Sequence, residues 1–129
     1  MCLMSVNSDL PEPKGTGYKI VVRMATKKLR PLFYGKRFLM RKWKRASNGT
    51  LFSNRGYESY PAGFHVYTNL QETELQLNRT VGKLVKGERA VLVEVKYSGG
   101  RAHGWQHNQR VVIAARIKPM RIIKEICQN

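Results

Sequence analysis

The sequence predicts an α+β fold with a twisted, mostly antiparallel sheet of five to seven short strands and one principal helix. Three observations predict this fold. Apolar and polar residues alternate with a period of two in several short runs, which is typical of strands. One stretch, residues 57–80, changes from that period to a helical one. The chain has 129 residues, of which 42% are hydrophobic, so it is long enough for one buried core but not for two.

The chain begins with residues 1–17, which have little pattern and include Pro11 and Pro13. We therefore expect a flexible N-terminal segment there, followed by a single α+β domain over residues 18–129. Alternation over residues 18–24 predicts the first strand of that domain. Residues 26–31 are interpreted as a basic loop.

The next part predicts a hairpin and a turn. Residues 32–34 and 38–43 flank a Gly-Lys pair, as the two strands of a hairpin would. An Asn-Gly turn at residues 48–49 is followed by a short extended piece, Leu51-Phe52. Residues 53–63 are expected to form a loop.

The predicted helix follows a short strand at residues 64–67. Thr68 has Gln71 three residues later, which is the spacing of a capping box. We expect the helix to run from Asn69 to about Asn78. Fewer than three turns are unstable alone, so Leu70 and Leu77 must pack onto the sheet.

Three more segments complete the prediction. Residues 90–97 alternate clearly enough to be the best strand, and Gly99-Gly100 is expected to end it. Residues 98–109 then form a long polar loop. Residues 110–116 predict a strand that is apolar on both faces and therefore central, and residues 117–127 predict the last strand.

The charge of the protein is its clearest departure from an ordinary domain. It contains 24 Lys and Arg against 8 Asp and Glu, a formal net charge of +16. Thirteen of the basic residues and none of the acidic ones fall in residues 13–57. Such concentrated charge attracts polyanions, which indicates an anionic nucleotide or a nucleic acid as the partner.

Aromatic rings are interleaved with this charge, and flat rings can stack on bases. We expect most of them to be core, with Tyr34 or Trp43 left for a ligand. The candidate ligand-binding residues of this stretch are Arg30, Tyr34, Lys36, Arg37, Arg41 and Trp43.

A second candidate site lies in the expected loop at 98–109, which is longer than a connection requires. It offers the ring of Trp105, with Arg101 and Arg110 as forked guanidinium groups for a phosphate. In the alternative interpretation, Trp105 covers the sheet edge and both arginines are solvated.

Metal binding and catalysis have little support in the sequence. His103 and His107 are four residues apart, but Gly104 disfavours a helix there and no third ligand is near; we expect no metal at these residues or at His65. No cofactor is expected, because the sequence has no phosphate-binding loop or dinucleotide fingerprint. We expect a protein that is not an enzyme, with a nuclease or an ADP-ribosyltransferase-like domain as the remaining alternative.

The cysteines and the apolar runs bear on the compartment. Cys2 and Cys127 form no disulfide framework, although a bond between them stays open. The sequence shows no signal peptide and no membrane-length apolar run. These features predict a cytoplasmic protein that does not contact a membrane.

One pattern resembles a known group of proteins. Gly63-Phe64-His65-Val66-Tyr67 precedes a helix, and strands at residues 90–97 and 111–116 lead into Ile122-Ile123. This pattern is similar to that of small phage and prophage proteins, which include anti-defence proteins that sequester cyclic nucleotide signals. The resemblance implies a homo-oligomeric binding protein for an anionic nucleotide, placed in the host cytoplasm.

The alternative is a nucleic-acid-binding protein, such as an anti-CRISPR inhibitor, that grips RNA or DNA with the basic 13–57 face. The two hypotheses differ in geometry. A nucleotide pocket needs a few converging arginines, whereas a nucleic-acid face needs charge spread along the surface.

Overall fold

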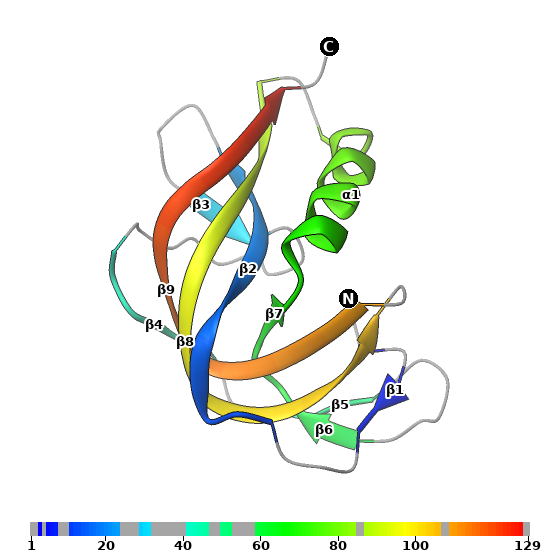
Figure 1. The fold of residues 1–129 in the computed structure, drawn as a ribbon, viewed down its shortest axis with the longest axis vertical. Helices are drawn as coiled ribbons and strands as arrows, with labels where there is room; N and C mark the ends of the chain where they lie inside the picture. Colours follow the sequence, from blue (N-terminus) through cyan, green and yellow to red (C-terminus); the bar gives the residue numbers. More distant parts are fainter. Residues whose placement is uncertain are drawn as a thin grey trace.

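The computed structural model of the protein has one principal helix and a mostly antiparallel sheet, which confirms the predicted α+β class (Figure 1). The structure describes residues 3, 5–7, 11–23, 29–31, 41–46, 50–52, 59–84, 87–106 and 109–127, with backbone only at residues 23, 29–31, 50–52 and 127. Within these ranges there is one helix, α1 (Leu70–Val81). The strands are β1 (Ser5–Val6), β2 (Lys14–Arg23), β3 (Leu29–Pro31), β4 (Lys44–Arg45), β5 (Thr50–Phe52), β6 (Ser59–Pro61), β7 (Phe64–Tyr67), β8 (Arg89–Gln106) and β9 (Gln109–Cys127).

The main sheet has seven strands in the order β1-β8-β2-β7-β9-β4, with β3 attached to β2, and β5 and β6 form a separate pair. Because β8 also pairs with β9, the strands β8, β2, β7 and β9 form a closed ring. The ring closes between β2 and β7 through one pair, Tyr18 and Tyr67. Gly17 permits this approach, since a Cβ atom there would lie 2.7 Å from the carbonyl oxygen of Tyr67.

The long hairpin of β8 and β9 corrects the prediction of a loop at residues 98–109. β8 continues through that segment to Gln106, and Gly99, with a φ of 65°, does not end it. The polar residues remain in a strand because β8 has a neighbour on each side there: Trp105 pairs with Arg110 of β9 and with Ser5 of β1. Backbone pairing on both edges outweighs the low strand propensity of the sequence.

β9 is likewise one strand of 19 residues, where two strands were predicted. The strands are therefore not all short, and Figure 1 shows β8 and β9 as long arms that bend together. Register shifts at three points, between Leu92 and Val93, Glu94 and Val95, and Gly100 and Ala102, permit this bend. Pro119 is tolerated inside β9 because it lies at the second of these irregularities, opposite Val95.

The expected boundary at residue 18 also needs correction. β2 begins at Lys14, and Leu3 is fully buried with its backbone N–H donating to the Tyr60 hydroxyl at 2.8 Å. Residues 3, 5–7 and 11–17 therefore belong to the fold. The predicted loops at 26–31 and 53–63 contain β3 and β6, respectively.

Part of the remaining prediction lies outside the described residues. The expected hairpin at 32–34 and 38–43 overlaps them only at residues 41–43, which form a turn with a φ of 59° at Arg41. The predicted Asn-Gly turn at 48–49 also lies outside the described residues. The extended piece that was predicted after it is confirmed as β5.

α1 is the predicted helix with a different cap and a later end, since its 12 residues continue to Val81 where an end at about Asn78 was predicted. The side chain of Asn69, and not that of Thr68, accepts a hydrogen bond from the backbone N–H of Glu72 at 3.0 Å. Asn69 has the extended backbone of a cap residue, so the capping-box interpretation is wrong by one position. Leu77 is fully buried in an apolar cluster with residues of the sheet, and Leu70 packs against the same cluster, as predicted.

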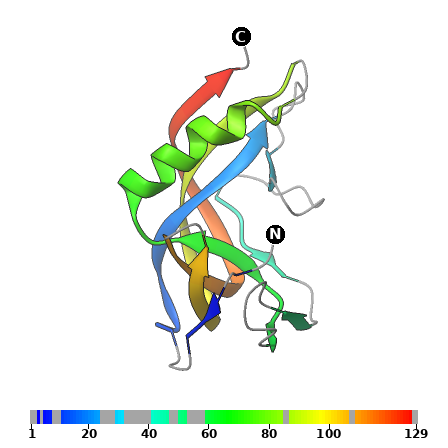
Figure 2. The same cartoon turned by 90° about the vertical axis from the view of Figure 1, so that its right-hand side faces the viewer.

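The strands bury two apolar clusters on their two faces. One cluster takes buried residues from all four strands of the ring, including Val21, Val66, Val93 and Val112. The other lies on the outer face beneath α1, which crosses the strands obliquely in Figure 2, and includes Leu77. No helix within the described ranges is long and apolar enough to cross a membrane.

Candidate functional site

The outer face that α1 leaves uncovered has two rows of polar residues. In the first row, Lys96 of β8 is the cross-strand partner of Thr16 on β2 and of Lys118 on β9. Directly opposite residues point to the same face of a sheet, so the two lysines are immediate neighbours. Thr16 and Lys96 are exposed and Lys118 is half-buried.

The second row lies two residues further along each strand and so points to the same face. Ser98 of β8 pairs with Lys14 of β2 and with Arg116 of β9, and Arg116 pairs in turn with Arg45 of β4. The Arg116 Nε–H donates to the Ser98 hydroxyl at 3.1 Å, which fixes one side of the guanidinium group. The two rows contain five cations, which we call the basic band: Lys14, Arg45, Lys96, Arg116 and Lys118.

The basic band contrasts with the other charged residues of the same hairpin. Glu94 and Arg121 are also cross-strand partners, and they form an ion pair at 3.2 Å. Near the strand ends, Arg89 approaches Glu125 at 3.6 Å. The basic band has two like-charge pairs instead, Lys96 with Lys118 and Arg45 with Arg116, an arrangement that destabilises a sheet unless an anion binds.

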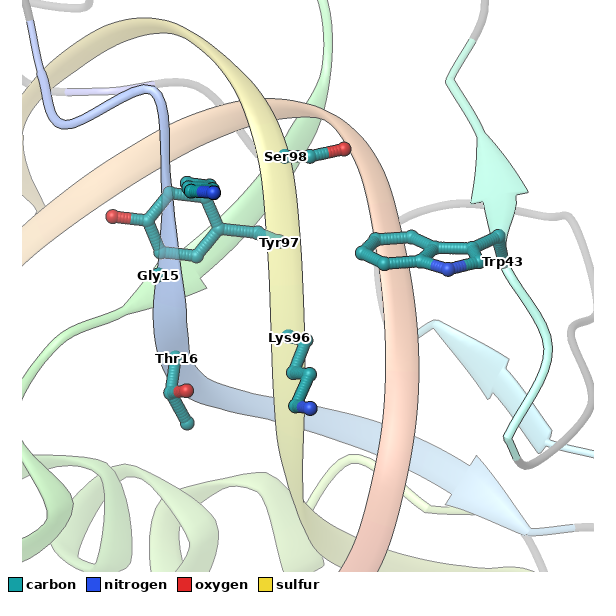
Figure 3. Close-up of a pocket in the computed structure, with 7 residues that line it drawn as sticks. Gly15, Thr16, Trp43, Lys96, Tyr97 and Ser98 are labelled. Carbon is teal, nitrogen blue, oxygen red and sulfur yellow. The ribbon is translucent and has the colours of Figure 1, made fainter.

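A cavity of about 460 Å³ opens beside the basic band (Figure 3). Its described lining residues include no acid; they are Lys14, Gly15, Thr16, Trp43, Lys96, Tyr97 and Ser98. In Figure 3, Trp43 extends from the segment that leads into β4 towards β8, where Ser98 and Lys96 project. The Trp43 side chain is 51% exposed, so its ring is accessible from solvent.

The predicted site residues of the 13–57 stretch are placed unequally. Arg41 and Trp43 lie together against β9, where the Arg41 backbone N–H donates to the carbonyl oxygen of Pro119 at 2.6 Å. The backbone of Arg30 pairs with Val22 in the β3–β2 ladder. The remaining three predicted residues lie outside the described part of the chain: Tyr34, Lys36 and Arg37.

The second predicted group, on the β8–β9 hairpin, makes contacts within the protein. Arg110 donates to Glu12 at 2.9 Å, and this hydrogen bond lowers the pKa of the Glu12 carboxyl group. Arg101 donates from Nη1 to the carbonyl oxygen of Ala62 at 2.6 Å. Trp105 is 49% exposed and is the cross-strand partner of Arg110. Arg101 and Arg110 therefore anchor the hairpin to other parts of the fold.

The histidines are placed separately. The imidazole of His103 is buried on β8, where its Nδ1 accepts from the Arg110 Nε–H at 3.4 Å. His65 lies on β7, and His107 is outside the described residues. Across the ranges that the structure describes, no three His, Cys, Asp or Glu side chains form a group that could hold a metal ion.

The sequence prediction found Trp43 but missed most of the basic band. Lys96, Arg116 and Lys118 lie outside the 13–57 stretch and alternate with apolar residues. This pattern is typical of the solvated face of an ordinary strand. The available signal was the spacing of two residues between Arg116 and Lys118, which places both on one face. Only the pairing of β8 with β9 brings them to Lys96.

Comparison with known proteins provides no further guidance: the chain matches no family model, no curated protein and no solved structure.

Proposed function

We propose that this protein binds nucleic acid through the basic band, as a binding protein without catalytic activity. The two adjacent like-charge pairs, Lys96–Lys118 and Arg45–Arg116, are the observation that supports this proposal. A polyanion that lies over them neutralises both pairs, and the release of its counterions supplies affinity.

The distribution of the charge favours nucleic acid over a small nucleotide. The five cations come from four neighbouring strands, β2, β8, β9 and β4. Three gaps of about 4.8 Å between strands give the band a width of roughly 14 Å. This spread suits several phosphates of one chain better than the single phosphate group of a mononucleotide.

A second candidate function is the binding of a free anionic nucleotide, favoured by the cavity beside Trp43. Its volume of about 460 Å³ lies within the range of small-molecule sites. In both cases the proposed place of action is the cytoplasm. The resemblance to phage counter-defence proteins would make a nucleic acid or a nucleotide signal of the host the target.

The test measures the affinity of a fluorescently labelled oligonucleotide from low to physiological salt. We expect a steep decrease with salt, with a slope in log K of up to about −3.5 for five neutralised phosphates of a single strand. Replacement of Lys96 and Lys118 by Gln should reduce affinity at least tenfold and flatten the slope. The matched control also removes two charges: Lys83→Gln combined with Lys124→Gln, at two exposed positions outside the basic band.

Equal affinities of the Lys96 and Lys118 variant and of the control variant would contradict the proposal. The nucleotide candidate is tested in the same assay by competition with free mono- and cyclic nucleotides. Native mass spectrometry of protein purified from cells reports any retained nucleotide and the number of subunits together.

A further inference from the structure

We infer that the nucleic acid on this face is single-stranded and that it places one unpaired base on the ring of Trp43. This inference rests on the proposed function and specifies its substrate class. It starts from the position of Trp43, whose ring lines the same cavity as Lys14, Lys96 and Ser98.

The ring lies beside the lysines and at the surface of the sheet. Its exposed fraction of 51% leaves room for a flat partner. In a duplex, each base is stacked between its neighbours and presents only its edges in the grooves. A base can therefore cover the Trp43 ring only if it is unpaired and turned out of a stack, as single strands allow.

The neighbouring row is suited to the phosphate of the same strand. Arg116 is held by its hydrogen bond to Ser98 at 3.1 Å, which leaves the outer nitrogens of its guanidinium group for a forked contact. Lys14 and Arg45 lie on either side of this pair. The two rows are about 7 Å apart, given a rise of about 3.4 Å per residue along a strand.

The two rows together define an arrangement for the ligand. The base lies over Trp43 and beside Lys96 in one row, while the phosphate lies over Lys14, Ser98 and Arg116 in the next. The hydroxyl groups of Thr16 and Ser98 add neutral hydrogen-bond donors that can approach the sugar and the phosphate. Stacking of this kind tolerates any base, so we expect little sequence preference.

The protein has two tryptophans, and this makes the test direct. The variant Trp105→Phe retains Trp43 as the single tryptophan, and Trp43→Phe retains Trp105, which is 49% exposed and lies on the hairpin away from the cavity. A single-stranded oligonucleotide of about twelve residues should quench the fluorescence of the first variant upon binding. The same oligonucleotide in duplex form should not quench the fluorescence of Trp105→Phe. Neither the single strand nor the duplex should quench the fluorescence of Trp43→Phe.

Affinities provide the second measurement. Trp43→Ala should weaken binding of the single strand roughly 5- to 150-fold, which corresponds to the loss of one stacked base, and should leave duplex affinity unchanged. Trp105→Ala is the matched control and should change neither. Melting temperatures of both variants verify that they remain folded.

The possible outcomes distinguish a failure of this inference from a failure of the proposed function on which it rests. If single strand and duplex bind equally, with the expected dependence on salt and on Lys96 and Lys118, the basic band binds nucleic acid but the stacking inference is wrong. If binding of both forms is independent of those lysines, the proposed function itself fails. Quenching of Trp43 by the duplex would also overturn the inference.

Discussion

The ammonium group of Lys19 lies 3.1 Å from the carbonyl oxygen of His65, inside the fold, where it donates a hydrogen bond from β2 to β7. The side chain of Lys19 is buried, and its nitrogen is 5.9 Å from the centre of the Phe64 ring. Desolvation by burial lowers the pKa of Lys19 to about 8 from its ordinary 10.5. The basic protein thus keeps one of its cations in the core, at a cost in stability.

This cost predicts a pH dependence of the free energy of unfolding. Between pH 8 and 10.5 the unfolded chain binds more protons at residue 19 than the folded protein, so stability rises with pH in that window. Lys19→Met should raise the free energy of unfolding at pH 7 by roughly 1–3 kcal/mol and remove most of this rise. Denaturant titrations at several pH values between 7 and 9.5 measure the free energy of unfolding of the wild type and of the variant.

The exposed Lys124 provides the control for this prediction, because Lys124→Met changes the net charge equally. Tyr67 limits the pH range in which the rise can be measured. Burial raises the pKa of Tyr67 to about 12, so its ionisation in the unfolded chain makes stability fall above pH 10. A destabilised Lys19→Met variant at pH 7 would show that the hydrogen bond to His65 outweighs the cost of burying the charge.

The like-charge pair of Lys96 and Lys118 predicts a conflict between stability and binding. Lys118→Glu creates an opposite-charge cross-strand pair like that of Glu94 and Arg121. We expect the variant to be more stable at low salt by roughly 0.2–1 kcal/mol and to bind oligonucleotides at least tenfold more weakly. Thermal melts at low and high salt test the first part, since salt screens the effect. Lys124→Glu, the control, should show neither change.

The cap of α1 can be tested by two neighbouring substitutions. Asn69→Ala removes the side chain that accepts from the Glu72 N–H, and should cost about 1 kcal/mol of stability. Thr68→Ala should cost less than about half as much, because its hydroxyl makes only a long contact, 3.4 Å, to the carbonyl oxygen of Arg110. Urea titrations compare the two variants. A larger loss for Thr68→Ala would restore the capping box predicted from the sequence.

Substitution of Arg110 tests which of the two candidate sites binds the ligand. The ion pair of Arg110 with Glu12 is partly exposed, with 33% and 58% of the side chains accessible, and its hydrogen bond to the buried His103 is long, at 3.4 Å. Arg110→Ala should therefore lower the free energy of unfolding by roughly 1–2 kcal/mol. We expect oligonucleotide affinity to stay within about twofold of the wild type. A loss of about 1.5–3 kcal/mol in affinity would instead show that Arg110 contacts the ligand, as the sequence suggested.

Local features of the sequence determined much of the fold. The alternation around Val91, Val93 and Val95 predicts a strand with one core face, and the structure buries all three in one cluster. The change of period after Tyr67 predicts the helix, because helical and strand spacing differ within a few residues. The excess of Lys and Arg predicts an anionic partner without showing where the cations meet.

The register of β8 against β9 was decided only by the tertiary structure. An extra residue of β8, Arg101, bulges out between Gly100 and Ala102, next to its hydrogen bond with Ala62. Without that bulge, pairing continued from the tip of the hairpin would place Lys118 opposite Tyr97, a core residue, and Lys96 opposite Pro119.

A shift of one residue turns a strand's side chains to the other face of the sheet. The sequence therefore determined which residues alternate, and hence that Lys96, Arg116 and Lys118 lie on strands. The contact between Arg101 and Ala62, residues 39 apart in the chain, accompanies the bulge that aligns these cations on one face. Such a long-range contact leaves no local pattern in the sequence, because its two ends meet only in the folded protein.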